Sequence, residues 1–208
     1  MTDERERDLG SATVTSVSVG SMDNNSYLVR CSATGQLLLV DAAAESDRLL
    51  GLLAGRPLGS VLTTHRHRDH WAALAAVVGA TGATTLAGGP DVDGIPVPTD
   101  RALESGHVVR VGEVELGVVR LTGHTPGGVA LTLAADDGTV HVFTGDSLFP
   151  GGVGRTGSPA DFARLLDDVS TGLFEVFGDD TVVLPGHGAP STLGAERPHL
   201  AQWRARGW

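Results

Sequence analysis

The chain has 208 residues, of which 41% are hydrophobic and 19% are charged, and its formal net charge is −10. This length and composition predict a soluble globular protein, while the acidic balance argues against nucleic-acid binding, which normally requires a basic surface. The single cysteine excludes an intrachain disulfide, and no stretch approaches the ~20 apolar residues of a membrane-spanning helix.

The N-terminal segment, residues 1–10, is mostly charged or polar and predicts a disordered tail. It lacks the apolar stretch of a secretory signal, so the cytoplasm is the expected compartment. No linker divides the remainder of the chain, and we therefore expect a single domain over residues 11–208. Nothing in the sequence indicates an oligomeric state.

Apolar runs separated by glycine-rich turns predict many short strands with helices between some of them. Two facing sheets with helices on the outside would accommodate their order. In chain order, the expected elements are strands at 14–19, 26–31 and 37–40, a helix at 45–54, a strand at 60–64, a helix at 71–78, a strand at 84–87, an irregular stretch at 88–100, a hairpin at 108–121, a second hairpin from strands at 129–133 and 140–144, a helix at 161–177, a strand at 181–184 and a helix at 194–206.

The segment that follows the strand at 60–64 contains four potential metal ligands within six positions: His65, His67, Asp69 and His70. His65 and His67 are two residues apart, so on an extended segment their side chains point the same way. Asp69 and His70 stand where the next helix is expected to begin. One loop thus offers ligands in two directions, which suits a pair of metal ions better than a single ion.

Three further residues, His124, Asp146 and His187, share one setting, because each follows an apolar strand and lies in a glycine-rich turn. Loops at strand ends are where sites are usually built, and glycine lets the backbone turn sharply there. The other histidines, at 107, 141 and 199, lack this setting. We expect one cluster of His65, His67 and His124, a second of Asp69, His70 and His187, and Asp146 as a bridge between them.

These ligands are imidazoles and carboxylates, with no thiolate among them. Such a donor set suits zinc, and also iron or manganese, and it disfavours a purely structural zinc site. We therefore expect two divalent metal ions as cofactors, with Zn²⁺ as the first choice.

The series His65-x-His67-x-Asp69-His70, followed by His124, Asp146 and His187, resembles the metallo-β-lactamase superfamily over nearly the whole chain. This resemblance implies an α+β fold, an αββα sandwich of two facing mixed sheets with helices on the outer faces and a dinuclear site at one edge. The segments 123–128, 144–149, 154–156 and 185–188 are similar to the glyoxalase II (hydroxyacylglutathione hydrolase) branch.

The resemblance implies a metal-dependent hydrolase that cleaves a thioester by a metal-bound hydroxide, which Asp69 orients while it binds metal. It also implies that Arg155 pairs with a carboxylate of a small-molecule substrate. The segment 188–190 follows His187 where glyoxalase II proteins usually carry a tyrosine used for glutathione. The expected substrate is therefore an acyl-glutathione or another acyl-thiol.

Two alternatives remain open. Persulfide dioxygenases resemble the chain in the same motifs but hold a single iron, for which the corresponding residues here are His65, His124 and Asp146. Hydrolysis of another ester or of a lactone would use the same two-metal chemistry as thioester hydrolysis.

Overall fold

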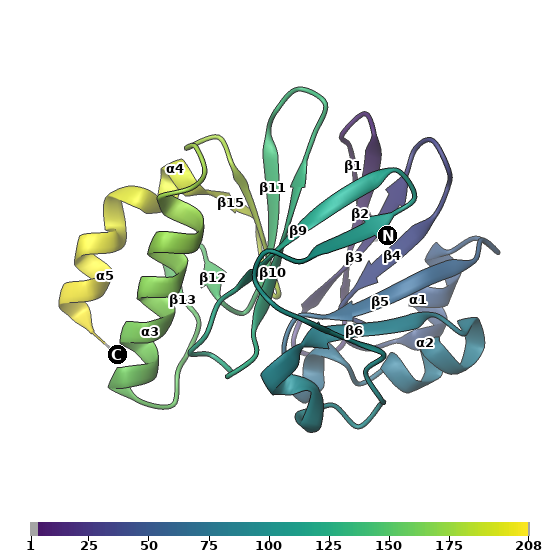
Figure 1. The fold of residues 1–208 in the computed structure, drawn as a ribbon, viewed down its shortest axis with the longest axis horizontal. Coiled ribbons are helices and arrows are strands. Elements are labelled where there is room, and N and C mark those ends of the chain that lie inside the picture. Colours follow the sequence, from purple (N-terminus) through teal and green to yellow (C-terminus); the bar gives the residue numbers. More distant parts are fainter. Residues whose placement is uncertain (1–3, 208) are drawn as a thin grey trace.

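A computed structural model describes residues 4–207 (Figure 1). Two β-sheets face each other; helices α1 (Ser46–Leu52) and α2 (Leu74–Thr81) lie on the outer face of one sheet. Helices α3 (Pro159–Val169) and α5 (Leu200–Arg206) lie on the outer face of the other. The expected αββα sandwich is thereby confirmed. No helix in the described part of the chain is long and apolar enough to cross a membrane.

The first sheet has seven strands in the order of the chain, antiparallel from β1 to β4 and parallel from β4 to β7. The connections from β4 to β5 and from β5 to β6 run through α1 and α2, which is the usual way to cross over between parallel neighbours. Its strands are β1 (Glu4–Asp8), β2 (Ala12–Val19), β3 (Asn24–Cys31), β4 (Leu37–Val40), β5 (Leu58–Thr63), β6 (Thr84–Gly88) and β7 (Arg101–Leu103).

The predicted disordered tail is wrong for residues 4–10. These residues include β1, which pairs antiparallel with β2 from Glu4 opposite Val17 to Asp8 opposite Thr13. An edge strand needs backbone hydrogen bonds on one side only and can expose charged side chains, so a charged composition does not exclude it. Residues 1–3 of the predicted tail lie outside the described residues.

The second sheet has six strands in the order β15-β14-β11-β10-β9-β8. Its strands β9, β11 and β14 run in one direction, because β10 is antiparallel to both β9 and β11 while β14 is parallel to β11. The strands are β8 (Val108–Val111), β9 (Val114–Arg120), β10 (Val129–Ala134), β11 (Val140–Gly145), β14 (Val182–Pro185) and β15 (Ser191–Thr192), and a separate ribbon joins β12 (Leu148–Phe149) to β13 (Gly152–Val153).

Several helices begin and end at other residues than the sequence predicted. A 3₁₀ turn, η1 (Arg68–His70), precedes α2, and another, η2 (Gly89–Gly94), lies in the stretch expected to be irregular. Helix α3 begins two residues early because Ser158 caps it, and it gives way to a π-helical turn, η3 (Ser170–Phe174). The last helix divides at Pro198, which lacks an N–H. Its parts are α4 (Leu193–Glu196), η4 (Arg197–His199) and α5.

Three apolar layers hold the sandwich together, one between the sheets and one under each set of helices. In the central layer, Tyr27 of β3 packs edge-on against Phe143 of β11, with ring centres 5.2 Å apart. Burial of these side chains removes apolar surface from water, which is the main driving force for folding. The layers therefore fix the two sheets face to face.

The two sheets are also joined by hydrogen bonds at the edge where β5, β11 and β14 end. Val129 N donates to Thr64 O over 2.9 Å, and Asn25 N donates to Gly186 O over 2.7 Å. The buried hydroxyl of Tyr27 donates to Pro185 O over 2.6 Å. These bonds hold the loops that follow β5 and β14 close together.

Candidate metal centre

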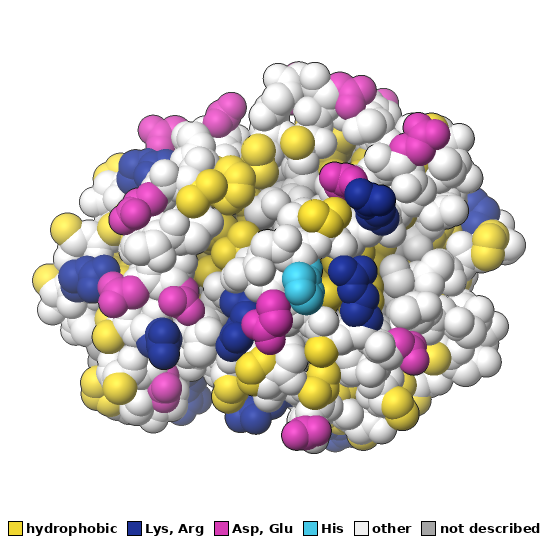
Figure 2. All heavy atoms as spheres, in the orientation of Figure 1, with side chains coloured by type: hydrophobic (Ala, Val, Ile, Leu, Met, Phe, Trp, Pro, Cys, Tyr) yellow, Lys and Arg dark blue, Asp and Glu magenta, His cyan; other side chains and the backbone are white. Residues whose placement is uncertain are grey.

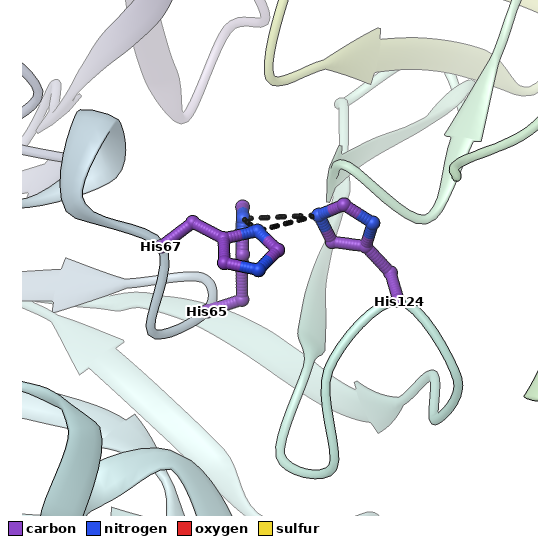
Figure 3. A group of neighbouring side chains, drawn as sticks. All are labelled: His65, His67 and His124. Atoms are coloured by element: carbon purple, nitrogen blue, oxygen red, sulfur yellow. Dashed lines mark hydrogen bonds between the residues drawn. The ribbon is translucent and has the colours of Figure 1, made fainter. Parts of the chain in front are cut away.

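The first predicted cluster is assembled from two loops, one after β5 and one between β9 and β10 (Figure 3). The atoms His65 Nε2, His67 Nδ1 and His124 Nε2 lie 2.9 to 3.3 Å from one another. Ligand atoms around a tetrahedral zinc ion, at about 2.0–2.1 Å from the metal, are separated by about 3.3 Å. The three nitrogens are thus spaced as ligands of one ion.

The second predicted cluster combines the start of η1 with the loop after β14. His70 Nε2 lies 3.4 Å from Asp69 Oδ2 and 3.2 Å from His187 Nε2, and the latter two atoms are 3.3 Å apart. This triangle has the same dimensions as the first. The structure therefore brings all six outer residues of the predicted site into two compact groups.

Asp146, directly after β11, lies between these groups. Its Oδ1 is 3.3 Å from His70 Nε2, and its Oδ2 is 3.5 Å from His187 Nε2 and 3.6 Å from His124 Nε2. Oδ1 is buried and has no hydrogen-bond partner among residues 4–207. This carboxylate thus reaches both clusters, as a bridging ligand must.

The outer ring nitrogens of four histidines are each bonded to the surrounding protein. A donor N–H on the outer nitrogen leaves a lone pair on the inner one, which is the tautomer that binds metal. The contacts are His65 Nδ1 to Thr64 Oγ1 (3.1 Å), His70 Nδ1 to Asp41 Oδ2 (2.8 Å), His124 Nδ1 to Arg155 O (2.6 Å) and His187 Nδ1 to Met22 O (2.9 Å).

Lone pairs and carboxylates that face one another at about 3 Å repel unless a proton or a cation lies between them. The orphaned Asp146 Oδ1 and the inward nitrogens have this arrangement. The donor set, imidazole with carboxylate, is the one that zinc, iron and manganese share. The centre therefore fits divalent metal ions.

Burial and the neighbouring charged groups shift the pKa values of the residues in the centre. Burial lowers the pKa of His65 well below its usual value, and the neighbouring imidazoles lower it further. Burial also acts to lower the pKa of His70, but the carboxylates of Asp41 and Asp146 outweigh it and raise that pKa to about 10. For Asp146, burial acts to raise the pKa, yet the neighbouring imidazoles of His187 and His70 outweigh it and hold the pKa below its usual range. A metal ion must displace the proton of His70, so acid weakens metal binding.

Asp41 supports the second cluster and was missed by the sequence analysis. Its buried carboxylate accepts hydrogen bonds from His70 Nδ1, from Thr64 N at 2.7 Å and from Thr64 Oγ1 at 2.8 Å. It therefore orients the His70 ring and the end of β5 together. Half of the signal was present, because Asp41 directly follows the apolar strand β4, but no glycine-rich turn accompanies it as at Asp146, His124 and His187.

Asp91, in η2, supports the first cluster and was also missed. Its fully buried carboxylate accepts from Arg66 N at 3.0 Å, from Thr125 Oγ1 at 2.6 Å and from Gly127 N at 2.8 Å. Arg66 lies between His65 and His67, and Thr125 follows the third ligand of the cluster. Asp91 thus clamps the two ligand loops to each other. No sequence motif marks it, since it lies in a stretch expected to be irregular.

Arg155, the predicted substrate contact, lies next to the first cluster. Its carbonyl oxygen is the acceptor for His124 Nδ1. Its exposed side chain lines a hollow of about 360 Å³ together with Phe162 and Arg206. Its role toward substrate stays a prediction.

Comparison with known proteins agrees with this geometry. The family model of the metallo-β-lactamase superfamily matches residues 19–187. The chain belongs to the metallo-β-lactamase superfamily of enzymes. The match begins in β2 and ends on the last predicted ligand, His187, so it includes both clusters.

Individual superfamily members are similar to the chain, and they include a relative from the glyoxalase II group that its motifs resemble. The hydroxyacylglutathione hydrolase of Polaromonas sp. strain JS666 is 34% identical over 169 residues, which are 79% of this chain; the chain spans 62% of that relative's length. The crystal structure of TTHA1623 in a di-iron-bound form has a TM-score of 0.74 at 32% identity, covering 88% of this chain and 96% of that one. The structure of ETHE1 from Myxococcus xanthus has a TM-score of 0.77 at 30% identity, covering 90% and 82%.

Proposed function

We propose that this superfamily member is a metal-dependent hydrolase that cleaves a thioester. Its substrate would be an acyl-glutathione or another small acyl-thiol. The observation that carries the proposal is the pair of three-ligand clusters sharing Asp146. The 34% identical hydroxyacylglutathione hydrolase supports the choice of a thioester. Divalent ions, Zn²⁺ by preference and iron or manganese by the same donors, supply Lewis acidity and lower the pKa of water toward neutrality.

In this proposal the residues of the chain divide the work among them. His65, His67 and His124 hold one ion and the second cluster holds the other, so the histidines serve as neutral ligands. Burial acts to raise the pKa of Asp69, but the amide of Asn24 and the His70 ring outweigh it, so the net shift is downward. Asp69 therefore remains a carboxylate at neutral pH and can accept a hydrogen bond from the attacking water. A thiolate leaving group needs little protonation.

The site has room for a small molecule beside this carboxylate. Asp69 lines a hollow of about 350 Å³ whose walls include Met22, Ala43, Ala44 and Ala72. On the face drawn in Figure 2, acidic and basic side chains are interspersed. With a net charge of −10, this pattern supports a small-molecule substrate rather than a nucleic acid. We assign Arg155 to a carboxylate of that substrate.

The proposal is tested with metal-loaded protein and a panel of thioesters that includes S-lactoylglutathione. We expect hydrolysis that a chelator abolishes and added Zn²⁺ restores. His67→Ala should reduce it at least ~100-fold, since the loss of a ligand exceeds the loss of a supporting contact. The control is His199→Ala, which removes an exposed histidine that belongs to neither cluster. Metal-loaded protein that hydrolyses no thioester of the panel would contradict the proposal.

A mono-iron persulfide dioxygenase is the second candidate, which the same residues also suit. The residues it requires lie together, with His65 Nε2 and His124 Nε2 3.3 Å apart and Asp146 Oδ2 3.6 Å from the latter. Oxygen consumption on glutathione persulfide, by protein holding a single iron, would establish that reaction instead. The same panel, extended to lactones and oxygen esters, tests the remaining hydrolase alternative.

A further inference from the structure

A buried amide reaches into the second cluster, and its contacts go beyond the hydrogen bond to Asp69 that the proposed reaction uses. Asn24, the first residue of β3, is 2% exposed. Its Nδ2 lies 2.9 Å from Asp69 Oδ2, 3.4 Å from His70 Nε2 and 3.3 Å from His187 Nε2. No sequence motif around Asn24 marks it as a ligand.

These contacts place four polar atoms in a tetrahedral arrangement. The terminal atom of Asn24 and the ligand atoms of the second cluster make six separations, all between 2.9 and 3.4 Å. They therefore mark the four corners of a nearly regular tetrahedron. Four ligands of a tetrahedral zinc ion are separated by about 3.3 Å. Three corners are predicted metal ligands, and Asn24 occupies the fourth.

The chemistry of a carboxamide allows both a donor and an acceptor at this corner. A half-turn about the Cβ–Cγ bond exchanges the NH₂ group and the oxygen with little change of position. The NH₂ group donates to Asp69, as the structure shows. The oxygen is a neutral ligand of the kind that hard divalent cations accept.

The backbone keeps Asn24 at this place. Asn24 and His187 form an isolated β-bridge, and Asn25 N donates to Gly186 O over 2.7 Å. The amide is therefore tied to the loop that carries one of its three neighbours.

We propose that Asn24 is a further ligand of the second cluster, which binds a divalent cation through Oδ1 together with Asp69, His70 and His187. Without the cation, the amide donates to Asp69 and thereby satisfies the carboxylate. These four side chains and the bridging Asp146 supply the protein ligands of the second ion. This inference concerns metal binding only, and it holds whichever substrate the enzyme uses.

The Asn24→Asp variant distinguishes two roles of Asn24, that of a metal ligand and that of a hydrogen-bond donor to Asp69. If Asn24 only positions Asp69 by its N–H, a carboxylate there loses the donor, repels Asp69 and weakens metal binding as Asn24→Ala does. If Asn24 is a ligand, the aspartate supplies a charged oxygen of the same size and binds the cation at least as tightly. Gln202→Glu is the control, because it makes the same change from amide to carboxylate at an exposed position of α5.

The measurement is Zn²⁺ bound per chain and its affinity by chelator competition, with Co²⁺ absorption spectra as a report on the ligand set. We expect Asn24→Ala to weaken the second ion by about tenfold or more and to change the Co²⁺ spectrum. We expect Asn24→Asp to retain both ions and the Gln202→Glu control to match the wild type. An Asn24→Ala variant with unchanged Zn²⁺ affinity, or an Asn24→Asp variant as weak as Asn24→Ala, overturns the proposal. Neither result depends on thioester turnover.

Discussion

Asp146 is the residue on which the two clusters depend. One of its oxygens faces His70, and the other lies between His124 and His187. Gly186 is required beside it, because a Cβ at that position would collide with the Asp146 carboxylate and the His70 ring. Packing and charge therefore agree on one position for this side chain.

Replacing Asp146 by alanine should lower the metal content below two ions per chain and abolish turnover, because each cluster loses a shared anionic ligand. Elemental analysis of the purified variant measures the first effect. Asp180→Ala, an exposed aspartate in the turn before β14, serves as the control. Unchanged metal content and turnover in Asp146→Ala would disprove the bridging assignment.

His141, in β11, is a buried histidine outside the clusters. It is 6% exposed, and its Nδ1 has no partner within the described chain. Burial and, after it, Arg7 lower its pKa, and Asp137 opposes them only in part. The His141 imidazole therefore binds a proton more tightly in the unfolded chain than in the folded one. Its contribution to the free energy of unfolding is fully present above about pH 6.5 and is lost as the pH falls below that value.

We therefore expect His141→Gln to lose less stability than the wild type between about pH 7 and about pH 5. Urea unfolding of metal-free protein at both pH values measures this difference. The comparison cancels the contribution of the cluster histidines, which both proteins share. Equal pH dependence in the two proteins would contradict the lowered pKa.

At the scale of elements, the candidate ligands that follow strands could be predicted from the sequence, but the residues that hold them in place could not. The seven candidate ligands could be picked out because they lie in loops or turns that follow apolar strands. The contacts of Asp91 reach residues 34 and 36 positions away, and no local pattern records such a distance. Strand β1 escaped prediction because its stability comes from the pairing with β2 rather than from its own charged residues.

Asp91→Ala should both destabilise the fold and weaken the first cluster. The change leaves three donors without their buried acceptor, and each such group costs about 1–3 kcal/mol. Loss of the clamp should reduce metal affinity by about 10–100-fold, as for other outer-shell contacts. Urea unfolding and Zn²⁺ titration measure these effects. Asp93→Ala, an exposed neighbour in the same turn, should change neither quantity. Normal stability and metal affinity in Asp91→Ala would refute the clamp.

At the scale of the molecule, the metal centre spans both sheets. The loop after β5 belongs to the first sheet, while His124, Asp146 and His187 come from the second. Any cation held by both groups therefore links the halves of the sandwich, and its binding energy adds to the stability of the fold.

Removal of metal by a chelator should lower the melting temperature, since an ion at 1,000 times its Kd adds about 4 kcal/mol of stability. Calorimetry of the loaded and chelated protein measures the shift, and re-addition of Zn²⁺ should reverse it. The same melting temperature in both samples would mean that no ion links the two sheets.

The number of metal ions bound per chain tests the account most directly. The seven ligands should hold about two divalent ions per chain, measured by elemental analysis on protein saturated with Zn²⁺ and freed of excess. A single ion at saturation would contradict the two-cluster centre and favour the mono-iron alternative.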